Sequence, residues 1–262
     1  SHPDYSRPVL RCPSSLPGRR SRRRFAHRIA ALAIVLAVIT VPACSSSNSR
    51  HHLTVALASS LEPTFAEIAR DFERTHPDVT VALEPGSSTA LAARVADGAS
   101  FAVFASADTA RVEALGSALS GPATVFATNR LAIAVRPGNP QRVHGLADLA
   151  RLRVVALCDP SAPCGKYAAA ALDAAGTTVP ESHVTRAPDA AATLRAVTRG
   201  DADAAVVYVT DVRGAGEQAT AVAIASEQNQ VAHYGIAVLD RASDPELARE
   251  FLDAVQIGRA HV

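Results

Sequence analysis

The sequence has 262 residues, of which 48% are hydrophobic and 19% are charged, and its formal net charge is +1. A chain of this length and composition buries a sizeable core in one or two domains, which excludes a disordered or collagen-like protein. The near balance of 26 basic and 25 acidic residues provides no overall field for nucleic acid. We therefore expect no nucleic-acid partner.

The N-terminal region has the order of charged and apolar residues that is typical of an export signal. Arg22–Arg24 and Arg28 precede the apolar run 29–41, which Cys44 closely follows. At about 1.5 Å per helical residue this run spans about 20 Å, which is short of the hydrocarbon core of about 30 Å. The sequence therefore predicts a signal peptide over residues 1–44, with a buried core helix as the alternative.

The segment around Cys44 resembles a bacterial lipobox, in which the cysteine is lipidated and becomes the mature N-terminus. Residues 45–50 are then a polar tether to a folded domain that begins near Leu53. The predicted location is the extracytoplasmic face of the cell membrane, with membrane contact through the lipid anchor only. The arginine-rich start resembles a twin-arginine motif, and general secretion is the alternative route.

From Leu53 onward the chain alternates short β-branched runs with longer amphipathic runs. This pattern is typical of α/β proteins, in which helices cover both faces of a parallel sheet. In chain order we predict a strand at 53–58, a helix through Phe65, Ile68 and Phe72, a strand at 79–83, a helix at 90–96, a strand at 102–105, a helix at 109–115, strands at 131–135 and 153–157, helices at 165–175 and 190–199, strands at 204–209, 220–224 and 231–239, and a helix at 245–255.

The loops after the predicted strands share a chemistry. In open α/β sheets, ligands bind beyond the carboxyl ends of the strands, where helix N-termini present unpaired N–H groups. Small and hydroxylated residues occupy these positions at 59–60, 86–89, 159–165 and 188–189. Such residues either cap helices or hold an anion, because both roles use the same donors. Simple N-caps are therefore the alternative to an anion site.

Two cysteines, Cys158 and Cys164, lie close together in the body of the chain. An exported protein folds in an oxidising compartment, where such a pair is a plausible disulfide. The alternative is a pair of free thiols. We expect no metal site here, because the closest histidines, His144 and His183, do not share a ligand spacing with the cysteines.

Six strings of this sequence, taken together, resemble the periplasmic molybdate-binding proteins of ABC importers. The resemblance runs from about residue 53 to about residue 255, and it depends on the order and spacing of the strings rather than on any one of them. The strings are ASSL at 58–61, GSSTALA at 86–92, VFASAD at 103–108, ATNRL at 127–131, DP followed by PCGKYA within 159–168, and VVYVTD at 206–211.

The resemblance implies a type II periplasmic-binding-protein fold, in which the chain crosses twice between two lobes. Each lobe of such a fold is a mixed, mainly parallel sheet flanked by helices. We expect one lobe to comprise 51–128 plus 232–256, and the other to comprise 129–231. The implied mechanism is closure of the lobes around an anion in the cleft between them.

The resemblance also implies five donors for an oxyanion. They are the hydroxyl groups of Ser60 and Ser88, the backbone N–H groups of Cys164 and Ala190, and the phenol of Tyr208. The expected ligand is molybdate or tungstate, and no cofactor, free metal cation or catalytic residue is implied. Because none of the five is a carboxylate, the set suits an oxyanion that carries no proton at neutral pH. A receptor for sulfate or another such tetrahedral anion is one alternative.

The implied partners are an ABC permease and its ATPase, which receive the anion from a monomeric binding protein. We expect no enzyme, because the sequence contains no Gly-x-Ser-x-Gly elbow, no Gly-x-x-x-x-Gly-Lys-Ser/Thr loop and no His-Glu-x-x-His motif. A secreted hydrolase is the alternative from another class of protein.

Four further features lead to local expectations. Lys166, the only lysine of the chain, stands beside the implied site, where it either supplies positive field or is a solvated helix residue. Gly235 stands where the family commonly has proline, and we expect it to loosen that crossover strand. The pair His51–His52 is expected on a solvated linker rather than at a metal. Residues 257–262 are expected to be a non-native tail, with a natural polar tail as the alternative.

Overall fold

The computed structural model describes residues 50–258, which belong to one compact unit. The predicted signal peptide, the lipidation of Cys44 and residues 45–49 of the tether lie outside the described residues, as do residues 259–262 of the expected tail. No helix between residues 50 and 258 combines the length and the apolar character that a membrane crossing requires.

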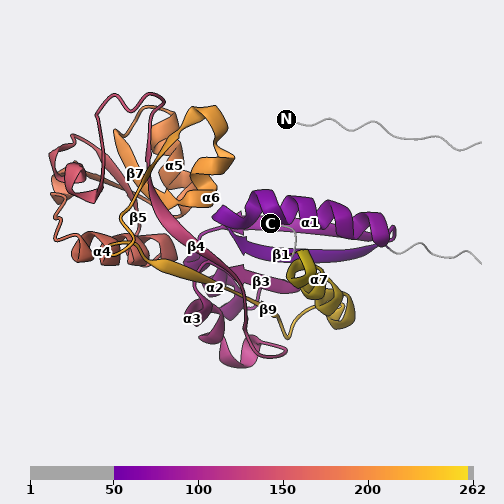
Figure 1. The fold of residues 1–262 in the computed structure, drawn as a ribbon. Coiled ribbons are helices and arrows are strands. Elements are labelled where there is room, and N and C mark those ends of the chain that lie inside the picture. The colour runs from indigo at the N-terminus through magenta and orange to yellow at the C-terminus, as the bar shows by residue number, and fades with distance from the viewer. Residues whose placement is uncertain (1–49, 259–262) are drawn as a thin grey trace, which may run out of the picture. The chain divides into compact units, whose positions relative to one another are not determined.

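Nine strands and seven α-helices make up the described part of the chain (Figure 1). The strands are β1 (His51–Ala58), β2 (Val79–Gly86), β3 (Val103–Ser106), β4 (Thr124–Val135), β5 (Val155–Cys158), β6 (Val184–Ala187), β7 (Ala204–Tyr208), β8 (Thr220–Ala223) and β9 (Val231–Val238). The α-helices are α1 (Glu62–Thr75), α2 (Ser88–Ala96), α3 (Thr109–Glu113), α4 (Pro163–Ala174), α5 (Ala190–Thr198), α6 (Val209–Gly214) and α7 (Pro245–Gly258). Short 3-10 helices lie at Ser59–Leu61, Gly116–Ala118, Leu146–Arg151, Glu181–His183 and Gly216–Gln218.

Every predicted strand and helix is present, and β6 and α6 are additional. β4 begins at Thr124, seven residues before the predicted start at Leu131. β1 begins at His51, so the two histidines that we expected on a linker instead open a strand, where both are exposed. α7 continues through Gly258, so two residues of the expected non-native tail extend a helix.

The strands follow the order β2-β1-β3-β9-β4-β7-β5-β6, and β8 also pairs with β4. The pairs β1–β2, β1–β3, β5–β6 and β5–β7 are parallel. The pairs β3–β9, β4–β9, β4–β7 and β4–β8 are antiparallel. The α/β class and the mixed character of the sheets are therefore confirmed, with parallel and antiparallel pairs in equal number among the described strands.

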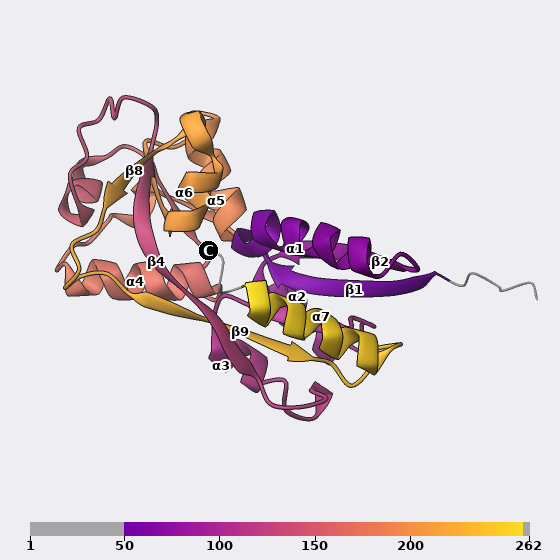
Figure 2. The same cartoon turned by 45° about the vertical axis from the view of Figure 1, so that its right-hand side comes forward.

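Two long strands connect the two halves of this strand order. Residues 124–130 of β4 pair with β9, whereas residues 131–135 pair with β7 and residues 132–135 also pair with β8. The first residue of β9, Val231, lies opposite Arg130, after which β4 changes partners. Figures 1 and 2 both show β4 and β9 running side by side between the elements around β1 and those around α5.

Helix α1 shows why the amphipathic runs of the sequence fold as they do. Phe65, Ala69 and Phe72 are buried, and their spacing of i, i+4 and i+7 places them on one face of the helix. Glu62 lies in the first turn and Arg74 in the last, where each charge complements the helix dipole. The buried face of α1 belongs to the largest apolar cluster, which continues through residues of α4 and α7.

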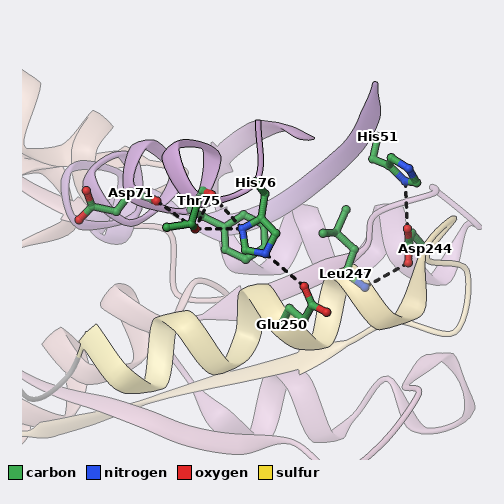
Figure 3. A network of polar contacts seen from close by, with 8 residues as sticks. His51, Asp71, Thr75, His76, Asp244, Leu247 and Glu250 are labelled. Carbon is green, nitrogen blue, oxygen red and sulfur yellow. Dashed lines mark hydrogen bonds and ion pairs between the residues drawn. The ribbon is translucent and has the colours of Figure 1, made fainter. Parts of the chain in front are cut away.

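The last helix, α7, is held against the first elements of the described chain (Figure 3). The rings of Phe72 and Phe251 meet edge to face with centroids 5.3 Å apart. His76 Nε2 lies 3.3 Å from a carboxylate oxygen of Glu250. His51 Nδ1 lies 3.0 Å from Asp244 Oδ2. The C-terminal helix therefore completes the packing around β1 and α1.

Gly235 lies in β9 at a close approach to α3. A Cβ atom at this position would lie 2.8 Å from the Cα atom of Thr109. The Thr109 hydroxyl donates a hydrogen bond to the backbone oxygen of His233 at 2.9 Å, which fixes the start of α3 against the strand. We expected Gly235 to loosen this strand, but the structure assigns the glycine a packing role, because any side chain would push α3 away.

Candidate functional site

All five residues that the resemblance implied as donors line one cavity. It encloses about 210 Å³ of empty space, including its opening to solvent. The residues that line it are Ala58, Ser59, Ser60, Gly86, Ser87, Ser88, Ala107, Ala162, Pro163, Cys164, Pro188, Asp189, Ala190 and Tyr208. Ser60, Ser88, Cys164, Ala190 and Tyr208 thus lie around one space although up to 148 residues separate them in the chain.

The fold explains why these residues meet. Ala58, Gly86 and Tyr208 are the last residues of β1, β2 and β7, so the cavity lies at the carboxyl ends of strands. The helices α2, α4, α5 and α6 begin at or next to lining residues. The first N–H groups of each helix have no partner within the helix, and they carry partial positive charge. Several helix N-termini therefore direct their positive ends at one space.

Ser88 keeps its hydroxyl hydrogen available for a ligand. Its Oγ accepts a hydrogen bond from the backbone N–H of Ala107 at 3.3 Å, and the side chain is buried. Ser59, the neighbour of Ser60, is used in a similar way, because its Oγ accepts from the N–H of Ala191 at 3.3 Å. In each case the oxygen acts as the acceptor, so the hydroxyl hydrogen is free to be donated.

Tyr208 presents an unsatisfied donor. Its side chain is 1% exposed, and its phenol oxygen has no hydrogen-bond partner among the described residues. Burial raises the pKa of this phenol well above its usual value, so the group keeps its proton at neutral pH. A buried polar atom without a partner is uncommon in folded proteins, and a bound acceptor at this position would satisfy it.

The two backbone donors lie in the first turns of α4 and α5. Cys164 follows Pro163 in the first turn of α4, and Ala190 is the first residue of α5. Asp189 caps α5, because its Oδ1 accepts the N–H of Ala192 at 2.8 Å. The cap leaves the N–H of Ala190 itself outside the helical hydrogen bonds.

A disulfide closes the loop that carries Cys164. The sulfur atoms of Cys158 and Cys164 are 2.06 Å apart, and the Cα atoms are 5.8 Å apart. Gly165 follows directly, and a Cβ atom there would overlap the backbone oxygen of Asp159. The loop therefore folds back tightly onto the start of α4, and only glycine permits this contact.

Lys166 does not line the cavity, and its ammonium group forms an ion pair with Asp108. Its Nζ donates to Asp108 Oδ2 at 2.8 Å, and this hydrogen bond raises the pKa of the lysine. The Asp108 carboxylate also accepts the N–H of Ala110 as the N-cap of α3. The ion pair thus joins α4 to the start of α3.

Two further contacts tie the disulfide loop to α2 and α3. The hydroxyl of Thr89 donates to the backbone oxygen of Ser161 at 2.7 Å. A guanidinium nitrogen of Arg111 donates to the same oxygen at 3.0 Å. We call these two hydrogen bonds, together with the ion pair between Lys166 and Asp108, the clasp.

Sequence reasoning missed some lining residues. Ser59 and Ser87 were visible beside the predicted donors, but Ala107 was not singled out because it carries no polar side chain. Asp189 places a carboxylate in the lining, although no carboxylate was expected among the donors. Its position before a predicted helix was the signal for its role as a cap. Within residues 50–258, no group of three or more His, Cys, Asp or Glu side chains is arranged to hold a metal ion.

Comparison with known proteins places this chain in a family. Residues 53–260 match the bacterial extracellular solute-binding proteins. The molybdate-binding protein ModA of Mycobacterium tuberculosis is 38% identical over 219 residues, which are 82% of this chain and 82% of that protein.

Solved structures show the same fold. The periplasmic molybdate-binding protein of Azotobacter vinelandii has a TM-score of 0.68 at 20% identity, with 80% of this chain and 98% of that chain covered. The sulfate-binding protein SubI of Mycobacterium tuberculosis has a TM-score of 0.67 at 19% identity, with 79% and 82% covered. These similarities confirm the predicted type II periplasmic-binding-protein fold. The chain belongs to the bacterial extracellular solute-binding proteins and, among them, to the ModA family of molybdate-binding proteins.

Proposed function

We propose that this protein captures molybdate or tungstate in the cavity and delivers the anion to an ABC importer. The observation that carries the proposal is the buried phenol of Tyr208, which faces no acceptor among the described residues and lines the same cavity as four other donors. The family relationship with a molybdate-binding protein supports the same ligand.

The chemistry of the donors favours an oxyanion without a proton. Ser60, Ser88 and Tyr208 supply O–H groups, and Cys164 and Ala190 supply backbone N–H groups. Such groups hold an anion together with helix dipoles, and no Lys or Arg is needed in the cavity. Asp189 is not among the proposed ligands, because an ionised carboxylate has no hydrogen to donate to an anion. Its Oδ1 caps α5 instead.

Binding proceeds by closure of two lobes, which we assign to 51–128 plus 232–256 and to 129–231. The strands β4 and β9 are the connections about which the lobes move. The change of partners along β4 supports this division, because residues 124–130 pair with β9 and residues 131–135 pair with β7. Each of the three contacts of the clasp then joins a residue of the first range to a residue of the second, and we propose that these contacts form on closure.

The biological setting follows from the family and the N-terminal sequence. A signal peptide over 1–44 exports the chain, and a lipid on Cys44 holds it at the extracytoplasmic face of the membrane. The monomeric closed form docks on a permease, which is driven by an ATPase. We propose a binding role rather than a catalytic one, because the chain belongs to a family of solute-binding proteins.

Calorimetric titration of the ligand-free protein with molybdate, tungstate, sulfate and phosphate tests the proposal. We expect tight one-to-one binding of molybdate and tungstate. A response to sulfate alone would favour the alternative receptor, and folded protein that binds none of the four anions would contradict the proposal.

A pair of serine substitutions tests the site itself. Ser60→Ala combined with Ser88→Ala removes two hydrogen bonds to a charged ligand, so we expect the dissociation constant for molybdate to rise by about a hundredfold or more. Ser226→Ala is the matched control, because Ser226 is exposed and its Oγ contacts only the neighbouring Glu227. Unchanged affinity in the double variant, in protein with native circular dichroism, would rule out this site.

A further inference from the structure

Behind Ser60 lies a second tyrosine that the sequence analysis did not assign to the site. The hydroxyl oxygens of Ser60 and Tyr234 are 3.0 Å apart. Tyr234 is 1% exposed and does not line the cavity. Its phenol is the only hydrogen-bond partner of the Ser60 hydroxyl among the described residues. The direction of this one hydrogen bond decides whether Ser60 offers the cavity a hydrogen or a lone pair.

Asn129 fixes that direction. Its side-chain oxygen accepts the backbone N–H of Arg130 at 2.9 Å, a bond that an amide nitrogen cannot accept. The side-chain nitrogen therefore faces the other two partners, and it donates to Thr210 Oγ1 at 2.8 Å and to the Tyr234 phenol at 3.3 Å. The Tyr234 oxygen is thus an acceptor toward Asn129.

Within residues 50–258, the Tyr234 hydrogen then has one acceptor left, which is Ser60 Oγ. Burial raises the pKa of the Tyr234 phenol above its usual value, so the hydrogen stays in place across the neutral range. Because the Ser60 oxygen accepts from Tyr234, the hydrogen of Ser60 is directed elsewhere, and the cavity is the space that Ser60 lines.

We propose that Tyr234 is a positioning residue, which accepts from Asn129 and donates to Ser60 so that Ser60 presents its hydrogen to the bound oxyanion. This inference rests on the proposed function of the cavity. The chain of hydrogen bonds connects the Ser60 hydroxyl to both crossover strands, because Asn129 lies in β4 and Tyr234 lies in β9. It also adds Thr210 of α6, which holds the Asn129 amide in place.

The Tyr234 ring has a separate structural role that the test has to preserve. Its centroid lies 5.6 Å from that of Tyr208 and 6.3 Å from that of Phe126, both in edge-to-face geometry. Tyr234→Phe keeps the ring and removes only the hydroxyl. We expect this variant to unfold as the wild type does and to bind molybdate about 3- to 10-fold more weakly, the effect of one neutral hydrogen bond.

A double-mutant cycle separates positioning from a general effect on structure. Tyr234→Phe is made in the wild type, in Ser60→Ala and in Ser88→Ala, and each protein is titrated with molybdate by calorimetry. If Tyr234 acts through Ser60, its substitution weakens binding in the wild type and in Ser88→Ala but has no further effect in Ser60→Ala. An equal effect in all three backgrounds, or in none, would overturn the inference.

The control for loss of a hydroxyl is Thr177→Val, because the Thr177 hydroxyl lies outside the cavity lining and, among the described residues, contacts only the backbone oxygen of Ala175. We expect its affinity for molybdate to match the wild type. The wild-type titration distinguishes failure of the proposed function from failure of the positioning role of Tyr234. A wild type that binds neither molybdate nor tungstate refutes the proposed function and the inference with it. A wild type that binds molybdate, with a cycle that shows no coupling, refutes the positioning role alone.

Discussion

At the scale of single residues, the hydroxyl groups of Ser60 and Ser88 each depend on a neighbour that supplies the oxygen with a hydrogen. The N–H of Ala107 donates to Ser88, and the phenol of Tyr234 lies within hydrogen-bond distance of Ser60. The phenol of Tyr208 has no such neighbour among the described residues. Affinity should therefore respond to groups that do not touch the anion, as well as to the donors themselves.

Gly235 offers a test of packing at this scale. Gly235→Ala places a Cβ atom 2.8 Å from the Cα atom of Thr109, so β9 and α3 have to separate. We expect the free energy of unfolding to fall by about 1–3 kcal/mol, the usual cost of overpacking. Urea denaturation measures this change. Gly121→Ala is the control, because a Cβ atom at Gly121 meets nothing within 4 Å.

At the scale of elements, the clasp joins α2 and α3 to the disulfide loop and α4 without using the cavity. Its hydrogen bonds converge on the backbone oxygen of Ser161, while the ion pair of Lys166 with Asp108 lies beside them. Lys166 is 59% exposed, so the ion pair alone adds little, and the two hydrogen bonds matter more. Each of the three contacts exists only while the two proposed lobes, 51–128 plus 232–256 and 129–231, lie against each other.

The clasp predicts an effect on binding from a residue outside the cavity. Thr89→Val keeps the shape of the side chain and removes the hydrogen bond to Ser161. We expect the dissociation constant for molybdate to rise about 3- to 10-fold, because the closed form loses one hydrogen bond. Thr177→Val serves as the control in the same calorimetric titration, since its hydroxyl contacts only Ala175 nearby. Equal affinities of Thr89→Val and the wild type would exclude a role for this contact in closure.

The disulfide predicts a second effect at the scale of elements. Replacing Cys158 and Cys164 together by alanine removes a cross-link over a short loop, which should lower the free energy of unfolding by about 2 kcal/mol. Urea denaturation with and without a reductant measures this difference. The reductant should destabilise the wild type and leave the double variant unchanged. A wild type that is insensitive to the reductant would indicate that the two cysteines are free thiols.

At the scale of the whole molecule, stability should depend on pH through one partly buried carboxyl group, that of Asp211. Burial raises the pKa of Asp211 to about 7, even though its Oδ2 accepts the N–H of Tyr208 at 2.9 Å. The native state therefore binds this proton more tightly than the unfolded chain, whose carboxyl has a pKa near 3.8. Stability from this group is complete below the unfolded pKa and is lost as pH rises.

Guanidinium denaturation between pH 4 and pH 8 tests this sign. We expect the free energy of unfolding to decline from about pH 4 to about pH 7 and to level off above. Asp211→Asn should remove most of the decline. Asp148, Asp159 and Glu181 have lowered pKa values, so their contributions are lost only as the pH falls toward the acid range. A stability that rises steadily between pH 4 and pH 7 would contradict the assignment.

The predictability of the fold differs from element to element. Long periodic runs such as α1 and the apolar run of β1 were predicted from the sequence, because their burial patterns repeat over many residues. β6 was missed because it has four residues and lies at the edge of the strand order, where none of the four is fully buried. α6 was missed because it has six residues and begins directly after β7. Strand pairing and tertiary packing, rather than the local sequence, decide whether such short segments form a strand or a helix.

The sequence by itself determined the order of most strands and helices and the loops that carry the donors, because these depend on residues close together in the chain. It also indicated the family, because six short strings occur in the family's order and spacing. Only the tertiary structure decided that Tyr234 lies behind Ser60, 174 residues away, and that Lys166 pairs with Asp108. It also showed why position 235 is a glycine, because β9 approaches α3 too closely there for a side chain. Hydrogen bonds and packing act over about 3–4 Å in specific directions. Partners distant in the chain are therefore fixed only when β4 and β9 bring their elements together.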